Sequence, residues 1–591
     1  MKVERAAGPN VEAPTTGAPA FIETHGLSFT YHQSARPALS GISFAQRQGE
    51  MVGVMGASGA GKSTFAKCLN RIIPELEDGV FEGTIHLDGR SLEGVSVAEL
   101  AGTVAMVFQD FEAQLFCTTV AQEVAFALEQ MAMEREQMKK RVAQAIEAVG
   151  LRGFERRDPT SLSGGEKQRL AIAAVLALNP SLVLLDEPTT DLDPEGKVQV
   201  FELIARLRTS GHNLIVIEHE AEELRRCDRL LLIDDGKVAA DAAPAQLLAE
   251  VELLERCGVH APGLNRVLNG LGIRAHAQNV DHAEDMIRNR FAHRLPVAAP
   301  TPLSTELESC DPLPIDTRRV DGSPSGPLAE VRSASFAYPE GPPVVSSVDL
   351  EIREGEFVAL VGQNGSGKTT LAKLIVGLLR PTAGVVAIAG KDIGRADAAG
   401  VARQVGYVFQ NPDHQIFADS VEDEVAFGPR NLGLAPGEVK RRSETVLEAV
   451  GLTAQRASDP FLLSKGERQR LAVASVLAMQ PRLLILDEPT TGLDYREQRR
   501  MMHLVVELNR SGIAILMITH TPWLVTEYAH RVVLMRAGRK LFDGGVRAFV
   551  SGDAMLARSS FRVPEVTQLA RRFGAISLSA EEFVRWLKTQ V

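Results

Sequence analysis

Two stretches of this 591-residue chain, GASGAGKST at 56–64 and GQNGSGKTT at 362–370, share the pattern G-x-x-x-x-G-K-[ST]. The glycines let successive backbone N–H groups curl around a phosphate without Cβ clashes. A helix that follows such a loop directs the positive end of its dipole at the same anion. Each loop directly follows an apolar run, MVGVM (51–55) or EFVALV (356–361). The chain is therefore predicted to bind a nucleoside triphosphate at two places.

The residues of these loops divide into phosphate ligands and metal ligands. Lys62 and Lys368 are expected to reach the terminal phosphates, and the hydroxyls of Ser63 and Thr369 are expected to bind Mg²⁺. The other loop residues predicted to bind ATP are Gly56, Ser58, Gly59, Gly61, Thr64, Gly362, Asn364, Gly365, Gly367 and Thr370.

The loops belong to a repeat that organises the whole chain. Gln410 follows Gln109 by 301 residues, and the same offset separates LSGGE at 162–166 from LSKGE at 463–467. LLDEPTTDLD with LLDEPTTGLD, and IVIEHE with LMITHT, keep this offset too. A period of this length far exceeds the roughly 20–50 residues of solenoid repeats, so it indicates duplication of a whole module.

Acidic pairs end one apolar run in each copy. Asp186 and Asp487 come at the ends of predicted strands, where a carboxylate can bind Mg²⁺ directly or through water. Glu187 and Glu488 follow immediately and suit the activation of a water for attack on the γ-phosphate. An isolated acidic pair at a strand end is more often merely solvated. The phosphate-binding loop in the same copy favours the catalytic interpretation.

Histidines and glutamines complete the predicted catalytic set. His219 and His520 end further apolar runs, where an imidazole could contact the γ-phosphate. Gln109 and Gln410 can bridge metal and water. A lone histidine at such a place is usually a satisfied core residue, and a lone glutamine is uninformative. Only the twofold recurrence supports a functional role for these four residues.

The apolar runs are continuous rather than alternating, which predicts parallel strands buried on both faces. Between the glutamine and the LSGGE-type segment, the pattern is helical at 134–150 and 438–451. Both helical patterns stop at a glycine, Gly150 or Gly451, a typical position just past a helix end. The chain is thus predicted to be α/β, with a helical segment inserted in each copy.

The composition narrows the class of protein. Sixty-four basic and 75 acidic residues give a net charge of −11, which argues against a nucleic-acid coat or a polybasic membrane anchor. No apolar run approaches the ~18 residues that span a bilayer, and the N-terminus lacks the apolar region of a secretory signal. The five cysteines are scattered and fit no disulfide or metal spacing, so they are expected to be core fillers or idle thiols. We expect a soluble chain of a reducing compartment.

In this order and twice over, the motifs resemble those of the nucleotide-binding subunits of ATP-binding cassette (ABC) transporters: Walker A, glutamine loop, LSGGE signature, Walker B and histidine loop. The resemblance covers about 21–290 and 328–591. It implies two tandem P-loop ABC ATPase domains, each with a RecA-like core, a helical subdomain and a small C-terminal extension. It also implies ATP and Mg²⁺ as cofactors.

In that family two cassettes face head to tail, and each ATP lies between one Walker A and the other signature. The resemblance therefore implies that Ser163 and Gly165 cap the ATP held by the second copy. Ser464 and Gly466 would cap the ATP of the first copy, so both sites can form within one chain. The aromatic residues that match the adenine-stacking position are Tyr31 and Tyr338.

The expected domain organisation follows from the repeat and from composition. A Pro/Ser-rich stretch separates the copies and is interpreted as a linker. Helix starts are expected in the tails, at the capping-box patterns Asp281-x-x-Glu284 and Ser579-x-x-Glu582. The predicted parts are a disordered leader (1–20), the first ATPase domain (21–250), its C-terminal extension (251–290), the linker (291–327), the second ATPase domain (328–550) and a C-terminal helical extension (551–591).

A narrower resemblance follows the glutamines. The stretch VFQNPDHQIFADSVEDEVAFGPRNLGL (408–434) is similar to energy-coupling factor (ECF) ATPases, and 107–130 is a looser copy. In that family this region receives the coupling helices of a transmembrane subunit, which contacts a small substrate-binding membrane protein. The resemblance implies a peripheral subunit on the cytoplasmic face of a membrane. Its implied role is ATP-driven uptake of a vitamin, a vitamin precursor or a transition-metal ion.

Other classes of tandem cassette remain as alternatives. Translation factors that bind ribosomes generally join their cassettes with a long charged helical linker and favour a basic surface. DNA-repair cassettes would need coiled-coil insertions or zinc-binding cysteine pairs, and the sequence shows neither. Within transport proteins, the nearest alternative class is the tandem ATPases of sugar importers. Only the ECF-like stretch argues against assigning the chain to that class.

The repeat contains one asymmetry in its signatures. Lys465 stands where the first copy has Gly164. The lysine side chain could obstruct the approach to phosphate, help to bind the anion or point into solvent. We expect obstruction to make the site formed by the first copy's Walker motifs the slower of the two.

Overall fold

The computed structural model describes residues 20–291 and 326–591, apart from 33, 35, 191, 193, 340, 558 and 560. By its internal contacts the chain divides into two compact units. The first comprises residues up to Gln278 together with Asp494–Arg496, and the second comprises Asn279–Leu493 and Glu497–Val591. Most of the predicted leader and linker lies outside the described residues, although Ala20 already begins a strand.

The first unit is built on a six-stranded sheet of order β10–β9–β3–β8–β7–β6. Its strands are parallel except for β10 at the edge. Every residue of β3, β7 and β8 is buried, as predicted from their continuous apolar runs. The bounds are β3 (Met51–Met55), β6 (Val104–Val107), β7 (Leu182–Asp186), β8 (Asn213–Ile217), β9 (Arg229–Asp234) and β10 (Lys237–Ala242).

A second, antiparallel sheet of the first unit has the order β2–β1–β4–β5. It was not predicted from the sequence. Its inner face forms one core with β3 and with α1 (Lys62–Leu69), the helix that follows the first glycine loop. This packing fixes the loop between two sheets. The bounds are β1 (Ala20–Tyr31), β2 (Leu39–Arg47), β4 (Gly79–Leu87) and β5 (Arg90–Ser91).

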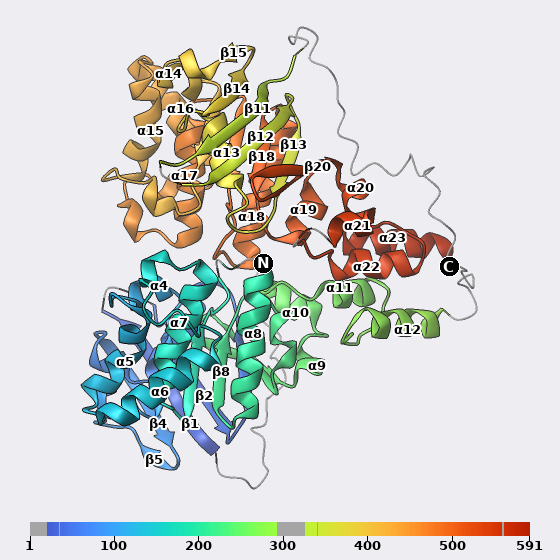
Figure 1. The fold of residues 1–591 in the computed structure, drawn as a ribbon. Coiled ribbons are helices and arrows are strands. Elements are labelled where there is room, and N and C mark those ends of the chain that lie inside the picture. The colour runs from blue at the N-terminus through green and yellow to red at the C-terminus, as the bar shows by residue number, and fades with distance from the viewer. Residues whose placement is uncertain are drawn as a thin grey trace. The chain divides into compact units, whose positions relative to one another are not determined.

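The inserted helical segment of the first unit consists of three helices that pack on one another, α5 (Val120–Gln130), α6 (Arg135–Ala148) and α7 (Gly164–Ala177) (Figure 1). The prediction that the helix ends before Gly150 is confirmed, since this glycine has φ 72°. The other helices of the unit are α2 (Ile72–Glu75), α3 (Val97–Leu100), α4 (Phe111–Gln114), α8 (Pro194–Thr209), α9 (Pro244–Leu247), α10 (Val251–Arg256) and α11 (Gly263–Gly270).

The second unit repeats this architecture. Its six-stranded sheet has the order β16–β17–β18–β13–β19–β20, and its antiparallel sheet has the order β12–β11–β14–β15. The strands of the first sheet are β13 (Phe357–Val361), β16 (Val405–Val408), β17 (Leu483–Asp487), β18 (Ala514–Ile518), β19 (Arg531–Arg536) and β20 (Arg539–Gly545). Those of the second are β11 (Ala329–Ala337), β12 (Pro343–Ile352), β14 (Ala383–Ile388) and β15 (Lys391–Asp392).

The helices of the second unit also match those of the first. Its inserted segment is α15 (Val421–Asn431), α16 (Pro436–Ala449) and α17 (Lys465–Leu477), and α16 ends before Gly451 as predicted. The remaining helices are α13 (Lys368–Ile375), α14 (Ala398–Ala402), α18 (Tyr495–Arg510), α19 (Pro522–Tyr528), α20 (Val546–Ser551), α21 (Asp553–Leu556) and α23 (Ala580–Gln590). The predicted α/β class with a helical insertion is confirmed in both copies.

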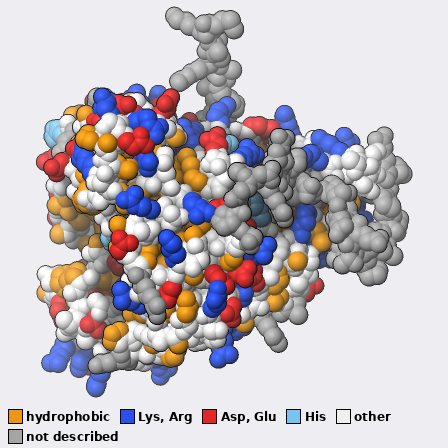
Figure 2. Space-filling model, turned by 90° about the horizontal axis from the view of Figure 1, so that it is seen from above, with side chains coloured by type: hydrophobic (Ala, Val, Ile, Leu, Met, Phe, Trp, Pro, Cys, Tyr) orange, Lys and Arg blue, Asp and Glu red, His pale blue; other side chains and the backbone are white. Residues whose placement is uncertain are grey.

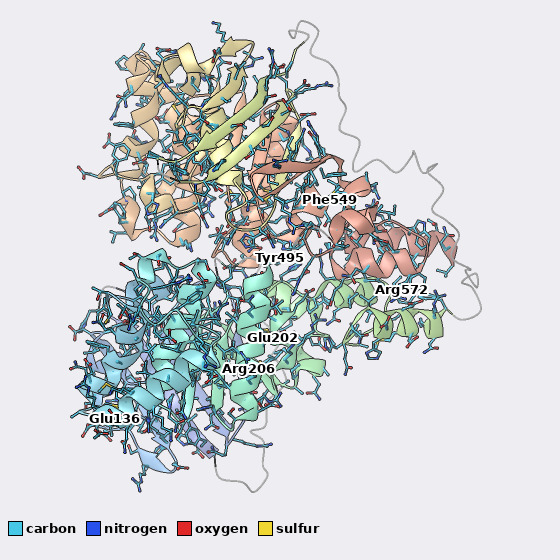
Figure 3. All side chains as sticks on the ribbon, viewed as in Figure 1. Glu136, Glu202, Arg206, Tyr495, Phe549 and Arg572 are labelled. Atoms are coloured by element: carbon cyan, nitrogen blue, oxygen red, sulfur yellow. The ribbon has the colours of Figure 1, made fainter. Side chains whose placement is uncertain are left out.

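Two tail helices pack together in the second unit, α12 (Val280–Arg290) and α22 (Glu565–Arg572). Arg572, labelled in Figure 3, forms an ion pair of 3.0 Å with Asp281. The guanidinium of Arg288 lies 4.7 Å from the ring centroid of Phe573. The division between the units, at Gln278–Asn279, therefore falls inside the stretch predicted as the extension of the first domain.

One of the two predicted helix caps is wrong. The side chain of Asn279, not Asp281, caps α12 by accepting a hydrogen bond from the His282 amide. The amide oxygen of Asn279 competes successfully because asparagine is as good an N-cap as aspartate. The cap at Ser579 is confirmed, since its hydroxyl accepts from the Glu582 amide.

Within the described ranges, no helix is long and apolar enough to cross a membrane. Three free cysteines, Cys68, Cys227 and Cys257, are buried, which confirms them as core residues. Cys117 is half-buried. Cys310 lies outside the described residues.

Candidate functional site

The two glycine loops have backbone conformations that only glycine adopts easily. Gly56 and Gly61 have φ of 153° and 103°. A Cβ at Gly56 would lie 2.2 Å from the Ile233 carbonyl oxygen, and one at Gly61 would lie 2.4 Å from that of Ala38. The second loop repeats these positions at Gly362 and Gly367. The middle glycine of each loop faces open space and follows an exposed residue. Gly59 follows Ser58, and Gly365 follows Asn364.

The loop lysines are buried and held by their own loops. Lys62 Nζ donates to the carbonyl oxygens of Gly56 at 2.9 Å and Ala57 at 2.8 Å. Burial lowers the pKa of Lys62, and the neighbouring carboxylates of Glu187 and Asp186 oppose that effect. Lys368 bridges its loop in the same way, with two hydrogen bonds of 2.8 Å. Both ammonium groups are thus held by two carbonyl oxygens of their own loops.

A hydroxyl and a carboxylate meet beside each lysine. In the second unit, Thr369 Oγ1 donates to Asp487 Oδ1 at 3.4 Å. In the first unit Ser63 lies close enough to Asp186 to lower the pKa of its carboxyl. Burial raises the pKa of Asp186 to about 6, and its Oδ1 is buried without a hydrogen-bond partner among the described residues. Hydroxyl and carboxylate oxygens, one of them unsatisfied, are a donor set that fits Mg²⁺.

The glutamate that follows each aspartate begins a sharp turn. Glu187 and Glu488 both have φ 49°, a left-handed conformation that is uncommon for residues other than glycine. Their amides donate to the carbonyl oxygens of Ile217 and Ile518 at 3.0 Å, so the neighbouring strand holds the turn in place. Strained backbone of this kind is typical of functional sites.

In the first unit, three side chains converge on Glu187. His219 Nε2 lies 2.6 Å from its Oε1, Gln109 Nε2 donates to Oε2 at 2.7 Å, and Thr190 Oγ1 donates at 3.2 Å. Burial disfavours the charged carboxylate, but His219, Lys62 and these hydrogen bonds outweigh it and lower the pKa of Glu187 to about 2. The carboxylate is therefore ionised at neutral pH.

The second unit has the same cluster with longer distances. His520 Nδ1 lies 3.1 Å from Glu488 Oε1, and Gln410 Nε2 donates to Oε2 at 3.3 Å. Thr491 donates at 3.2 Å. The pKa of Glu488 is also lowered, because His520 and Lys368 outweigh the effect of burial. The sequence predicts that the histidines contact the γ-phosphate and that the glutamines bridge metal and water. In this structure all four side chains contact a glutamate.

The signature residues lie at the N-termini of α7 and α17. Ser163 and Ser464 are the N-caps, each in a reciprocal capping box with the glutamate three residues on. Gly165 and Gly466 lie in the first turn of these helices. Within the described part of each unit, no hydrogen bond or ion pair joins a signature serine to a glycine loop.

Lys465 does not point freely into solvent. The residue is half-buried, and its side chain lies over Gly492 in the turn after Walker B of the same unit. A Cβ at Gly492 would overlap its Nζ. At the equivalent sequence positions the first copy has Gly164 in place of the lysine and Asp191 in place of the glycine.

The two tyrosines have different surroundings. Tyr31 Oη is hydrogen-bonded to Thr64 Oγ1 at 3.1 Å, which ties it to the first glycine-loop helix. Burial raises its pKa. Tyr338 is exposed and packs edge-on against Phe336, with ring centroids 4.9 Å apart. Its ring is therefore the more accessible of the two.

Sequence reasoning missed two residues that touch this machinery. Tyr407 is hydrogen-bonded to Asp487, and Glu218 lies buried next to His219. Both occupy positions at which the copies differ, Met106 against Tyr407 and Glu218 against Thr519. A position-by-position comparison of the two copies would have drawn attention to them.

Comparisons with known proteins agree with this geometry. A family model described as ABC transporter matches residues 39–190 and 345–491. A protein of Caldanaerobacter subterraneus, provisionally named an ABC transporter ATP-binding protein, is 43% identical over 566 residues, covering 95% of this chain and 98% of its own. A protein of Methanosarcina acetivorans with the same provisional description is 38% identical over 553 residues, covering 93% and 90%.

Among solved structures, the chain is similar to cbiO1 from Clostridium perfringens, described as part of the ABC transporter complex cbiONQ. The two are 31% identical with a TM-score of 0.37, and the match covers 42% of this chain and 98% of cbiO1.

Proposed function

This chain belongs to the ABC transporter family and is an ATPase; from that premise we propose that it energises an ECF-type importer. We infer that it does so as a peripheral subunit on the cytoplasmic face of a membrane. Its transmembrane partner would in turn hold a small substrate-binding membrane protein. The proposed cargo is a vitamin, a vitamin precursor or a transition-metal ion.

Two pairs of exposed phenylalanine side chains, one in each unit, support this proposal. Phe116 and Phe417 lie just beyond the glutamines and are 63% and 58% exposed. Each packs edge-on against a second exposed phenylalanine, Phe126 or Phe427, with ring centroids 4.7 and 4.6 Å apart. Exposed aromatic side chains at equivalent places in two repeats suit a partner that docks on both.

The backbone that presents these pairs is rigidly held. Glu123, buried in α5, accepts hydrogen bonds from the amides of Phe116 at 3.0 Å and Cys117 at 2.7 Å. Glu424, buried in α15, accepts from Phe417 and Ala418, both at 3.0 Å. A buried carboxylate is costly unless it is satisfied in this way. The arrangement therefore supports a preformed docking surface in each unit rather than an incidental exposure.

The chemistry proposed for each unit uses the groups described above. Glu187 or Glu488, ionised at neutral pH, accepts the proton of the attacking water. Lys62 or Lys368 neutralises charge on the terminal phosphate, and the glycine-loop amides bind the bridging oxygens. When Mg²⁺ is bound through Ser63 with Asp186, or Thr369 with Asp487, it supplies further neutralisation of the phosphate oxygens.

We further propose that each signature completes the site of the other copy, as in the family. Ser163 and Gly165 would cap the ATP of the second unit, and Ser464 and Gly466 that of the first. ATP binding would then close the two halves of one chain on each other, and hydrolysis would release them. Movement of the halves would be passed to the partner through the aromatic pairs.

The surface charge supports a protein partner over nucleic acid. The net charge is −11. On the face shown in Figure 2, basic and acidic side chains are interspersed rather than gathered into one basic patch. A ribosome-binding factor would favour a basic stripe that tracks the phosphate backbone.

The test is affinity purification of the full chain from gently solubilised membranes, with identification of every co-eluting protein. We expect integral membrane proteins to co-elute with the parent chain and to be lost from the double variant Phe417→Ala, Phe427→Ala. A matched control is Leu541→Ala, which removes an exposed apolar side chain from β20. Recovery of ribosomal proteins, or equal recovery of membrane proteins with all variants, would contradict the proposal.

A further inference from the structure

The strand that leads to each glutamine differs between the units at one buried position. In the second unit, β16 carries Tyr407, which is 8% exposed. In the first unit, β6 carries Met106 at the equivalent place, 301 residues earlier. Because β16 runs parallel to β17, with Tyr407 opposite Ile485, its phenol can reach the end of β17.

The phenol makes a direct contact with the metal-binding aspartate predicted there. Tyr407 Oη donates to Asp487 Oδ2 at 2.7 Å in a buried setting. The other oxygen, Oδ1, accepts from Thr369 Oγ1 at 3.4 Å. Burial raises the pKa of Asp487, and the two hydrogen bonds oppose that effect. Both carboxylate oxygens therefore have assigned partners, with the phenol on one side and the hydroxyl expected to share Mg²⁺ on the other.

At the equivalent position of β6, the first unit has Met106 in place of this phenol. The thioether of Met106 cannot donate; it accepts a hydrogen bond of 3.4 Å from Asn70 Nδ2. Asp186 Oδ1 is left buried without a hydrogen-bond partner among the described residues. The aspartates of the two Walker B motifs thus have different surroundings.

We propose that Tyr407 is a positioning residue of the second metal site: its phenol fixes the Asp487 carboxylate so that Oδ1 faces the cation, and the second unit binds the divalent cation of Mg²⁺–ATP more tightly than the first. A hydrogen bond to a charged carboxylate is among the stronger ones in proteins. Partners that orient a metal ligand typically contribute about 10- to 100-fold in metal affinity. The inference rests on the Mg²⁺–ATP site of the proposed function, but not on its membrane partner.

The experiment measures metal binding rather than turnover. The full chain carrying Asp186→Asn, which leaves one intact metal site, is titrated with Mn²⁺ in the presence of a non-hydrolysable ATP analogue. Free Mn²⁺ is followed by electron paramagnetic resonance. Adding Tyr407→Phe, which removes only the hydroxyl, should weaken Mn²⁺ binding by about tenfold. Binding of the analogue in EDTA should stay unchanged, because the phenol touches the metal ligand and not the nucleotide loop.

Two controls separate positioning from general damage. In the full chain carrying Asp487→Asn, only the first metal site remains, and Tyr407→Phe should leave its Mn²⁺ affinity unchanged. Tyr528→Phe removes another phenol of the second unit, which accepts a hydrogen bond from Arg499, and should have no effect in either background.

Three outcomes would overturn the proposal. The first is unchanged or tighter Mn²⁺ binding on Tyr407→Phe in the Asp186→Asn chain. The second is equal weakening in both backgrounds, which would indicate a general loss of structure. The third, failure of the parent chain to bind any Mn²⁺ with the analogue, would contradict the Mg²⁺–ATP site of the proposed function as well. Loss of membrane partners would leave all these measurements untouched.

Discussion

In the first unit a buried glutamate, Glu218, stands directly before His219, whereas the second unit has Thr519 before His520. Glu218 Oε1 accepts two hydrogen bonds from Thr189, of 2.7 Å from its hydroxyl and 3.1 Å from its amide. Burial nevertheless raises its pKa to about 8. At the equivalent position the second unit has Thr519, and its Asp487 accepts a hydrogen bond from the phenol of Tyr407.

The comparison shows where a duplicated enzyme diverges. The groups proposed to touch ATP are nearly the same in both units, but the residues packed directly behind them differ. Those residues decide the orientation and charge of the catalytic groups. The glutamate clusters illustrate this, because histidine and glutamine lie 2.6 and 2.7 Å from Glu187 but 3.1 and 3.3 Å from Glu488. Two sites of one composition can therefore work at different rates.

Removal of the loop lysines is expected to have the largest effect on ATP hydrolysis. At these lysines the two units are alike. Lys62→Ala and Lys368→Ala should each lower ATP hydrolysis about 100-fold, since each deletes a fixed cation from the phosphate site. If both sites close together, the double variant should lose less than the product of the single losses. The measurement is kcat of the purified full chain. Loss of only about half of the hydrolysis in each single variant would show two independent sites.

Removal of the general bases tests whether the units differ in turnover. Glu187→Gln and Glu488→Gln should each lower kcat by about 100-fold or more at the site affected. We expect Glu488→Gln to cost more of the total hydrolysis, because the first site is proposed to be the slower one, facing the Lys465 signature. Steady-state hydrolysis at saturating ATP gives the comparison. Equal losses would indicate equivalent sites.

Glu218 should make the stability of the first unit depend on pH. A carboxyl whose folded pKa is raised stabilises the fold fully below its unfolded pKa, and this contribution is lost as pH rises through about 8. The loss at full ionisation is on the order of 5 kcal/mol. Hydrogen exchange in β8, corrected for intrinsic rates, should therefore show less protection at pH 9 than at pH 6.

Glu218→Thr, which installs the residue of the second unit, should remove this pH dependence. The reciprocal change Thr519→Glu should introduce it in β18. A parent chain with equal protection in β8 at both pH values would show that Glu218 is not the buried acid described here.

The smallest expected effect concerns the signature lysine. Lys465→Gly restores the residue of the first copy and removes the side chain that lies over Gly492. We expect a rise of about two- to threefold in turnover at the first site, measured in the Glu488→Gln background. Lys465→Gln is the matched control, because it keeps the bulk and removes the charge. No change with Lys465→Gly would show that the lysine has no influence on hydrolysis.

The sequence predicted what depends on local pattern. The buried strands, the glycine loops and the helix ends at Gly150 and Gly451 all follow from periodicity and from backbone requirements, and the structure confirms them. The antiparallel sheets were not predicted because β1 and β4 pair although residues 32–78 lie between them, and a register shift breaks the alternation.

The site residues divide in the same way. Residues inside motifs could be named in advance, but Tyr407 and Glu218 act through contacts between neighbouring strands. The periodicity of a strand can be read from its own sequence. Which side chain a strand residue contacts at the end of the next strand depends on the register between the two strands. Register is fixed by the whole sheet, and a single copy of the sequence does not reveal it.

Because α12 packs on α22 in the second unit, the stretch between the two copies does not join one unit to the other. The described chain stops after Phe291 and resumes at Gly326, and both points belong to the second unit. Both residues that flank positions 292–325 thus belong to the same unit, and the chain first passes from one unit to the other at Gln278–Asn279. The free energy of joining two fixed points grows only with the logarithm of chain length, about 0.6 kcal/mol for each doubling. Insertions or a cut in this stretch should thus lower the free energy of unfolding far less than a single residue inserted at Gln278.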